Sequence, residues 1–216
     1  MEPIVIVGTG LAGYTVAREF RKLDPHTPLA LFSADDGGYY SKPMLSNALA
    51  QDKNAETLLL SDARQMATQL RAEVYPHCRI TALDPTTRRI RNGQQELAYT
   101  KLVLALGADP VRLPLAGDAA DAVLSINDRA DYAQFRAAIE GKRRIVILGG
   151  GLIGCEFAND LVAAGYEVAI IDIATHPLGR LVPAAIGLAL RDALAGLGVK
   201  WHLGRSAASV DRTADG

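Results

Sequence analysis

A glycine-rich turn between an apolar run and a helical pattern occurs twice in this chain, and this repeat constrains the fold most strongly. In the second copy, the apolar residues 145–148 are followed by Gly149, Gly151 and Gly154 in the spacing G-x-G-x-x-G. The residues after this turn are apolar at helical intervals, which predicts a helix. A strand, a tight turn and a helix in this order place unpaired helix N–H groups where they favour a phosphate.

Each glycine of the second copy has an expected role. Gly149 permits the tight turn, Gly151 lets the backbone approach the phosphates, and Gly154 lets the helix pack on the strand. The next apolar strand, residues 168–171, is followed by Asp172. A carboxylate at this point suits the ribose hydroxyls of a nucleotide that carries no 2′-phosphate.

The first copy matches the second almost residue for residue. Residues 4–7 are β-branched, and Gly8, Gly10 and Gly13 follow at the same spacing. One such motif alone is a weak signal, because a glycine turn also occurs without any ligand. Two copies, each between a strand and a helix, instead predict two nucleotide sites and therefore two cofactors that react with each other.

The two copies differ at the end of their second strand. In the first copy the apolar run 29–32 is followed by Ser33, where the second copy has Asp172. Ser33 and the nearby Asp35 are both candidates to replace the ribose carboxylate, and the residues alone do not decide between them.

Apolar periodicity and turn residues predict the remaining elements. Helices are predicted at residues 11–23, 62–71 (with Ser61 as N-cap), 128–140 (with Asn127 or Asp128 as N-cap) and 184–197. Strands are predicted at 101–108 and 199–203, and a three-stranded meander is predicted at 78–83, 88–91 and 96–99. Residues 109–121 are predicted to form a crossover between domains, and residues 207–210 a hairpin arm. The expected fold class is α/β, with two Rossmann-like parallel sheets of which the first carries the meander.

Composition narrows the class of protein. The net charge of −1 indicates no nucleic-acid partner. Cys78 and Cys155 are far apart and in no metal-binding spacing, which suits a reducing compartment and predicts neither a metal site nor a structural disulfide. The first apolar run is short and has no basic flank, so we expect no signal peptide, no membrane span and a cytoplasmic location.

With these motifs assembled, the chain resembles the flavoprotein reductases with two dinucleotide-binding domains, and among them the rubredoxin reductases. The resemblance covers essentially the whole chain and rests on both glycine turns and on residues 40–46 (YSKPMLS), 102–108 (LVLALGA), 126–128 (IND) and 151–158 (GLIGCEFA). One departure is Leu106, where the broader family prefers threonine. The family chain also continues well beyond Gly216, so both domains are expected to be incomplete here and this chain alone inactive.

The resemblance implies which residues bind which cofactor. Domains would comprise residues 1–110 (FAD-binding), 111–140 (crossover and linker helix) and 141–216 (NAD-binding). FAD would contact Thr9, Gly10, Leu11 and Ala12 at its pyrophosphate, Ser33 and Ala34 at its adenosine, Ile80 at its adenine and Lys42 beside the flavin. Glu156 would point toward the flavin where nicotinamide stacks, although a carboxylate near a helix start is also favoured by the helix dipole. From composition alone, Lys42 fits a solvated loop residue.

The reaction implied by the resemblance is hydride transfer from NADH to FAD, followed by release of single electrons to rubredoxin iron, in a setting such as alkane oxidation. It needs no catalytic side chain. One alternative is a ferredoxin reductase that serves an oxygenase, and another is a flavoprotein without catalysis. A disulfide reductase is disfavoured because residues 41–43 contain no cysteine. The helix dipole is expected to lower the pKa of Cys155, although neither cysteine is expected to be catalytic.

Overall fold

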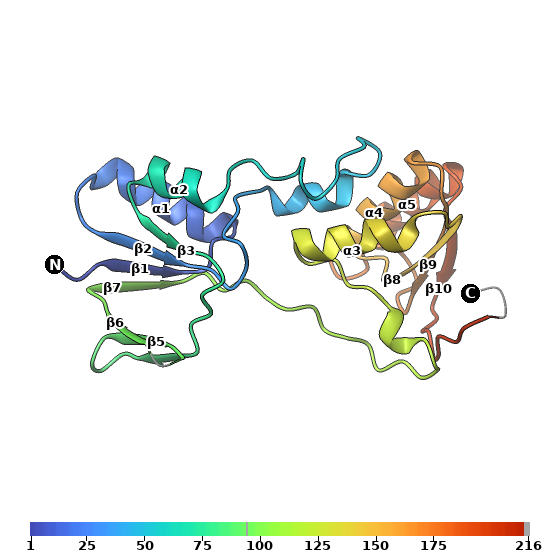
Figure 1. Ribbon diagram of the computed structural model, residues 1–216. Coiled ribbons are helices and arrows are strands. Elements are labelled where there is room, and N and C mark those ends of the chain that lie inside the picture. The colour runs from blue at the N-terminus through green and yellow to red at the C-terminus, as the bar shows by residue number, and fades with distance from the viewer. Residues whose placement is uncertain (94, 214–216) are drawn as a thin grey trace. The chain divides into compact units, whose positions relative to one another are not determined.

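The computed structural model describes residues 1–93 and 95–213, which form an α/β protein (Figure 1). The chain divides into two compact units. The first contains Met1–Lys42 and Thr57–Asp109, and the second contains Pro43–Glu56 and the residues from Pro110 onward. The chain therefore enters the second unit briefly at Pro43 and returns to the first at Thr57 before it leaves again.

The first unit is built on a parallel sheet in the order β3-β2-β1-β7. Its strands are β1 (Ile4–Val7), β2 (Leu29–Phe32), β3 (Glu73–Tyr75) and β7 (Lys101–Leu104), and its helices are α1 (Leu11–Leu23) and α2 (Ala63–Leu70). Ile4 at the start of β1 is paired with Leu29 on one side and Lys101 on the other. The carboxyl ends of these strands therefore meet at one edge, where such sheets bind ligands.

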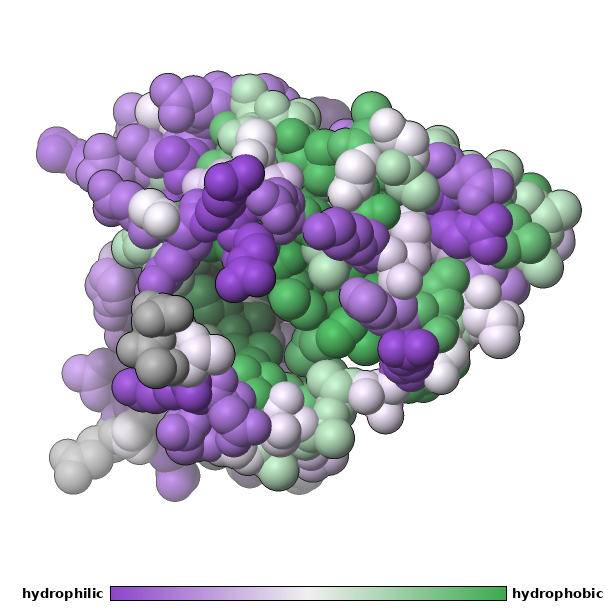
Figure 2. Space-filling model, turned by 90° about the vertical axis from the view of Figure 1, so that its right-hand side faces the viewer, coloured by the Kyte–Doolittle hydropathy of each residue, from purple (hydrophilic) through white to green (hydrophobic). Residues whose placement is uncertain are grey.

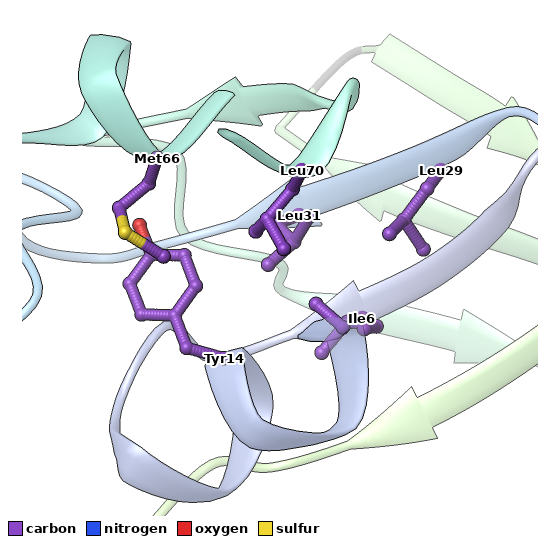
Figure 3. Close-up of a cluster of buried hydrophobic side chains, with 7 residues drawn as sticks. Ile6, Tyr14, Leu29, Leu31, Met66 and Leu70 are labelled. Carbon is purple, nitrogen blue, oxygen red and sulfur yellow. The ribbon is translucent and has the colours of Figure 1, made fainter. Parts of the chain in front are cut away.

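Both faces of this sheet are buried. On one face, Ile6 and Leu31 pack with Tyr14 of α1 and with Met66 and Leu70 of α2 (Figure 3). Tyr14 is fully buried, its hydroxyl donates to the Gly37 carbonyl, and burial raises the pKa of this phenol. Alternate strand residues point to the other face, because side chains alternate along a strand. Burial on both faces explains why the strands are apolar throughout.

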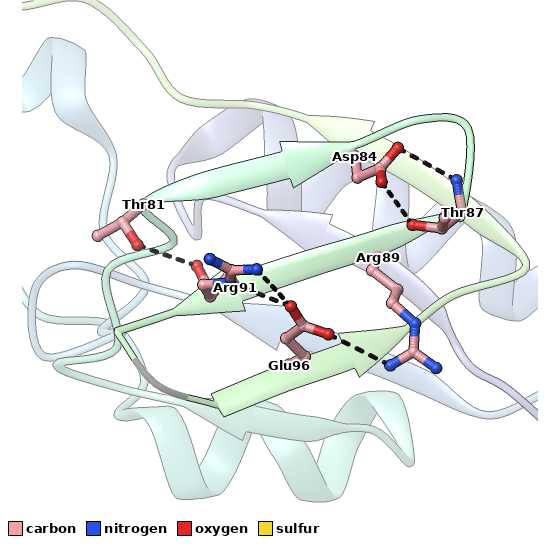
Figure 4. A network of polar contacts seen from close by, with 6 residues as sticks. All are labelled: Thr81, Asp84, Thr87, Arg89, Arg91 and Glu96. Atoms are coloured by element: carbon pink, nitrogen blue, oxygen red, sulfur yellow. Dashed lines mark hydrogen bonds and ion pairs between the residues drawn. The ribbon is translucent and has the colours of Figure 1, made fainter.

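The other face of the sheet is covered by an antiparallel meander of β4 (Ala82–Asp84), β5 (Arg89–Asn92) and β6 (Gln95–Ala98). Ile90 of β5 is its most buried residue and packs in the same cluster as Val5 and Phe32. Polar contacts lie on the outer side, where Glu96 accepts hydrogen bonds from Arg89 and Arg91 (Figure 4). Such exposed ion pairs contribute little to stability, so the apolar face holds the meander.

The second unit repeats the first in its central part. Its parallel sheet has the order β10-β9-β8 and consists of β8 (Arg144–Leu148), β9 (Glu167–Asp172) and β10 (Lys200–Leu203). Its helices are α3 (Arg129–Ile139), α4 (Leu152–Ala163) and α5 (Ala184–Gly196), with the short 3₁₀ helices η1 (Lys42–Asn47) and η2 (Ala120–Ala122). Phe135 of α3 contacts the ring of Phe157 of α4 at a centroid distance of 5.8 Å, and this aromatic pair joins the two helices.

The surface of the second unit is mixed. Figure 2 faces the end of this unit and shows a hollow lined by hydrophobic residues with hydrophilic residues around it. Exposed apolar residues of the unit include Ile173, Leu181 and Ile186. None of the helices among the described residues is both long and apolar enough to cross a membrane.

The α/β fold class, the two parallel sheets and the meander are confirmed. The strands at 4–7 and 29–32 and the helix at 11–23 have the predicted bounds. The strand β3 was not predicted, because it has three residues and only Val74 among them is half-buried. Its place in the sheet depends on tertiary contacts, such as the stacking of the Tyr75 ring on the Phe32 ring, with 4.8 Å between the ring centroids.

Two predicted details at helix and strand ends were wrong. Asp62, not Ser61, caps α2, because its carboxylate accepts from the Gln65 N–H at 2.7 Å and the Gln65 side chain accepts from the Asp62 N–H. This capping box satisfies two of the N–H groups at the helix start. The predicted strand 101–108 ends at Leu104, because only β1 pairs with it and the pairing stops at Val7.

Two predicted strands were also wrong in extent or type. Residues 78–81 lie outside the meander, and β4 begins only at Ala82. The predicted hairpin arm at 207–210 forms no strand. Ser209 instead makes a single parallel bridge with Ala116 of the crossover, and backbone hydrogen bonds at 2.9 and 2.8 Å flank this bridge.

Candidate functional site

The helices that follow the glycine turns begin without a side-chain cap. Gly10 and Gly151 are the N-cap residues of α1 and α4, and neither helix has an acidic residue in its first turn. In contrast, α2 and α3 begin with capping boxes formed by Asp62 and Asp128. The first N–H groups of α1 and α4 thus lack the carboxylate that satisfies those of α2 and α3. The helix α5, which follows Pro183, also has no side-chain cap, but of the α-helices in the described residues only α1 and α4 begin at a glycine turn, and this combination suits an external anion.

Each glycine of the second turn meets a different local requirement. Gly149 has φ of +108°, which residues with a side chain rarely adopt. A Cβ atom at Gly154 would lie 2.0 Å from the Gly149 carbonyl oxygen, so the helix packs against the turn only with glycine there. A Cβ atom at Gly151 would meet nothing within 4 Å. Gly151 therefore borders open space in front of the start of α4.

The first turn has the same geometry with one further constraint. A Cβ atom at Gly13 would lie 1.9 Å from the Gly8 carbonyl oxygen, and one at Gly10 would meet nothing within 4 Å. Gly8 has φ of +109°, and its Cβ would lie 2.1 Å from the carbonyl oxygen of Ala105, which follows β7. Both turns thus form a cradle of the kind that fits a dinucleotide pyrophosphate.

Asp172 lies at the end of β9 beside the second turn. Its carboxylate accepts hydrogen bonds from the N–H of Gly150 and, at 2.6 Å, from the N–H of Ala174. Asp172 and the turn line one cavity of about 960 Å³ in the second unit. A carboxylate and an uncapped helix start that face the same cavity are the pair of groups that a ribose and a pyrophosphate require.

Two arginines of this cavity modify its charge. Arg180 and Arg205 line it together with Asp172. Sequence reasoning missed Arg205, which lies two residues after β10. Its N–H donates to the Asp172 carbonyl at 3.0 Å, because Leu203 is paired with Asp172 in the parallel sheet. Its place two residues after the predicted strand 199–203 was the signal that could have identified it.

The corresponding strand end in the first unit is organised by two hydroxyls. Ser33 donates its hydroxyl hydrogen to Asp35, so the Thr9 hydroxyl donates to Ser33, at 2.5 Å. Thr9 and Ser33 are both buried, whereas Asp35 is exposed. The Gly37 N–H also donates to Asp35, at 2.9 Å. Ser33 and Asp35, the two candidates for the ribose position, therefore lie in one hydrogen-bonded chain that begins in the glycine turn.

The other predicted FAD contacts lie around the first unit. Leu11 and Ala12 are the first two residues of α1, directly after the turn, and Ala34 is exposed next to Ser33. Ile80 is half-buried against the cluster that contains Ile90, in the loop before β4 and not in the meander itself. Lys42 is exposed at the start of η1.

Glu156 and Asp160 lie one helical turn apart on α4 and both bind the segment 43–56. The Ser46 hydroxyl donates to the Glu156 carboxylate at 2.5 Å. Asp160 is 4% exposed and accepts from the N–H groups of Leu49 and Ala50 at 2.8 and 2.9 Å. Sequence reasoning missed Asp160 and Ser46. The i, i+4 spacing of two carboxylates on an otherwise apolar helix was the available signal.

The cysteines have no reactive environment. Burial, and then the charges of Asp172 and Glu156, raise the pKa of Cys155 to about 11, so the expectation of a lowered pKa was wrong. Desolvation is the largest cause, which fits a residue that is only 4% exposed. Cys78 is half-buried, with its Sγ atom 2.7 Å from the Asn92 amide nitrogen. Among residues 1–93 and 95–213, no three His, Cys, Asp or Glu side chains are grouped as a metal site.

Comparison with known proteins agrees with this geometry. The model of the pyridine nucleotide-disulphide oxidoreductase family matches residues 2–215. The chain is 47% identical over 216 residues to the rubredoxin-NAD(+) reductase of Alcanivorax borkumensis, and 46% identical over 222 residues to that of Acinetobacter baylyi. Each alignment covers 100% of this chain and 56% of the relative. The chain thus spans little more than half the length of these relatives.

A solved structure extends the similarity to three dimensions. The crystal structure of a ferredoxin reductase from Rhodopseudomonas palustris superposes with a TM-score of 0.87 at 25% identity, over 100% of this chain and 53% of that one. The repeated glycine cradle, the two parallel sheets and the family match over residues 2–215 lead to one conclusion. The chain belongs to the pyridine nucleotide-disulphide oxidoreductase family.

Proposed function

We propose that this chain is the FAD- and NADH-binding part of a flavoprotein reductase that delivers electrons to rubredoxin. The observation that carries the proposal is the repeated cradle in front of an uncapped helix, with an end-of-strand carboxylate, Asp172, in the second copy. The 47% identity to a relative named rubredoxin-NAD(+) reductase supports the choice of reaction. The proposed domains are residues 1–110 for FAD, 111–140 as crossover and linker helix, and 141–216 for NADH.

The proposed FAD site belongs to the first cradle. The start of α1 would bind the pyrophosphate through backbone N–H groups, and the hydroxyl chain from Thr9 through Ser33 to Asp35 would bind the adenosine end. Further proposed contacts are Gly10, Leu11, Ala12, Ala34, Lys42 and Ile80. An exposed amino group such as that of Lys42 would stabilise negative charge on a reduced flavin.

The proposed NADH site belongs to the second cradle. Gly149, Gly151 and Gly154 shape the turn, and Asp172 would accept hydrogen bonds from the ribose hydroxyls. The same carboxylate would repel a 2′-phosphate, which favours NADH over NADPH. Glu156 is the proposed acidic contact for the reacting half of the site. A bound flavin supplies two-electron exchange with nicotinamide and one-electron exchange with iron.

The acceptor has a second candidate. The solved ferredoxin reductase from Rhodopseudomonas palustris shares the fold at 25% identity, so a ferredoxin is the alternative to rubredoxin. Both candidates are small iron proteins, and neither would need a redox-active cysteine in this chain. The free state of Cys78 and Cys155 is consistent with a cytoplasmic location, which we include in the proposal.

One assay distinguishes the alternatives. The complete reductase, of which this chain is proposed to be a part, is loaded with FAD, and NADH is added without oxygen while the flavin absorbance is recorded. We expect bleaching by NADH and return of the absorbance when oxidised rubredoxin is added. Faster return with a ferredoxin would favour the alternative acceptor. Bound FAD that NADH does not bleach would favour a flavoprotein without catalysis and contradict the proposal.

A further inference from the structure

The segment 43–56 is attached to the second unit at its far end by side chains of α3. The backbone carbonyl of Lys53 accepts from the Tyr132 hydroxyl at 3.1 Å and from the Arg136 guanidinium at 2.7 Å. Tyr132 is fully buried, and the rings of α3 pack on α4. These donors therefore fix the end of the segment on a rigid part of the unit.

The middle of the segment is held by Asp160. The carboxylate accepts from two successive backbone N–H groups, those of Leu49 and Ala50, one on each oxygen. Bonds from N–H groups to a charged acceptor are stronger than neutral ones, and Asp160 is 4% exposed. Because α4 positions Asp160, the helix also determines where residues 46–50 lie.

Ser46 connects this anchored segment to Glu156. Ser46 is 2% exposed, and its hydroxyl lies 2.5 Å from the Glu156 carboxylate and 3.2 Å from the Pro43 carbonyl oxygen. A serine hydroxyl has one hydrogen to donate. The shorter distance and the negative charge of the acceptor assign this hydrogen to Glu156. The carboxylate is thereby tied to a buried group that cannot move away.

We propose that Ser46 is a positioning residue for Glu156 and holds its carboxylate in one orientation toward the cofactors. This inference rests on the proposed function, in which Glu156 contacts the reacting half of the cofactor site. A glutamate side chain that is free to rotate loses conformational entropy when a ligand orders it. The bond from Ser46 orders the side chain before the cofactor binds. Without it, Glu156 would adopt several rotamers, and few molecules would be ready to react.

The test measures the rate at which NADH reduces bound FAD in the complete reductase, by stopped-flow absorbance with oxygen excluded. We expect Ser46→Ala to lower this rate about tenfold, the size of effect expected for one hydrogen bond to a charged group. Ser46→Thr keeps the hydroxyl and is expected to restore most of the rate. The matched control is Ser209→Ala, which also removes a serine-to-carboxylate hydrogen bond, to Asp211 at 2.9 Å on the exposed surface, and should match the wild type.

Repeating the Ser46→Ala change in a protein that lacks Glu156 separates an effect on the orientation of Glu156 from a general effect on the structure. In the Glu156→Ala protein there is no carboxylate to orient, so Ser46→Ala should cause no further loss of rate. An equal loss in both backgrounds would overturn the proposal, as would a wild-type rate in the Ser46→Ala protein. Saturation with NADH should locate the loss in the limiting rate of flavin reduction and not in the NADH concentration that gives half of that rate, because the orientation of Glu156 affects the reacting geometry.

Failure of the proposed function would appear differently. If the complete wild-type reductase binds FAD but does not react with NADH, the proposed function is wrong whatever Ser46 does. Thermal unfolding without cofactors then tests the hydrogen bond between Ser46 and Glu156. It compares the wild type, Ser46→Ala, Glu156→Ala and the protein with both changes. A double-mutant cycle should give a coupling between Ser46 and Glu156. Additive changes in melting temperature would show that Ser46 does not orient Glu156 and would overturn the inference.

Discussion

Two glycines of the second turn, three residues apart, should respond to alanine in opposite ways. A Cβ atom at Gly154 would lie 2.0 Å from a backbone oxygen, whereas one at Gly151 would meet nothing within 4 Å. Gly154→Ala should therefore destabilise the fold and Gly151→Ala should not. Gly151→Ala should instead weaken NADH binding, because its methyl group would occupy the space in front of the helix start where the pyrophosphate is proposed to lie.

The magnitude follows from the geometry. Overpacking of a tight site costs about 1–3 kcal/mol, and the obstacle at Gly154 is a carbonyl that cannot rotate away. Alanine within a helix recovers up to about 1 kcal/mol relative to glycine. Because this obstacle is rigid, we take the upper end of the overpacking cost and expect a net loss of about 2 kcal/mol for Gly154→Ala, which lowers the melting temperature by roughly 4–16 °C over the range of domain sizes that includes the second unit. For Gly151→Ala we expect a change within about 0.5 kcal/mol.

The assays are thermal unfolding by circular dichroism and an NADH titration followed by tryptophan fluorescence. Trp201 is the only tryptophan of the chain, and a Cβ atom at the neighbouring Gly150 would lie 3.4 Å from its ring, so it reports on this turn. Gly196→Ala in α5 is the control, since a Cβ there meets nothing within 4 Å and should only add helix propensity. Equal destabilisation by Gly151→Ala and Gly154→Ala, or unchanged NADH affinity for Gly151→Ala, would refute the reasoning.

Four further predictions concern individual side chains. Asp172 should make kcat/KM at least tenfold higher for NADH than for NADPH, and equal values would contradict its proposed role. Lys42→Met should change the flavin spectrum or reduction potential with the fold intact, and no change would assign Lys42 to a solvated loop. Replacing Cys78 and Cys155 with alanine should leave acceptor reduction largely intact, which a loss of turnover with FAD still bound would disprove. Folding raises the pKa of Cys155 from 9.0 to about 11, so the thiol of the unfolded chain loses its proton at lower pH than that of the folded chain. The free energy of unfolding should therefore fall between about pH 9 and pH 11. Denaturation of wild type and Cys155→Ala at several pH values measures this, and an equal pH dependence in both would contradict it.

Local chemistry explains which parts of the fold were predictable. The strand, turn and helix of each copy are specified within a dozen residues, since glycine is required at Gly149 and Gly154 by backbone geometry alone. The strand β3 is different, because its three residues carry no apolar alternation and join the sheet through contacts with β2. The bridge from Ser209 to Ala116 likewise joins segments far apart in the chain, which periodicity cannot show.

The candidate site also contains residues whose role was predictable from local sequence and residues whose role was not. Asp172 was predictable because a carboxylate directly follows a predicted strand beside a glycine turn. The i, i+4 spacing could have pointed to Asp160, but the partners of Asp160 and Ser46 were not predictable, since they depend on the return of the segment 43–56 to α4, about 110 residues away in sequence. Cys155 was misjudged because sequence shows its position at a helix start but not its burial, and burial determines the direction of its pKa shift.

The central claim is that the two cradles bind two different nucleotides, FAD at the first and NADH at the second. Equilibrium titrations of FAD and of NADH with wild-type protein, Gly10→Ala and Gly151→Ala test it most directly, because a Cβ atom fits at either glycine without a clash. We predict that Gly10→Ala weakens only FAD binding and that Gly151→Ala weakens only NADH binding, each about tenfold or more. Loss of both nucleotides in either variant, or of neither in both, would contradict the assignment.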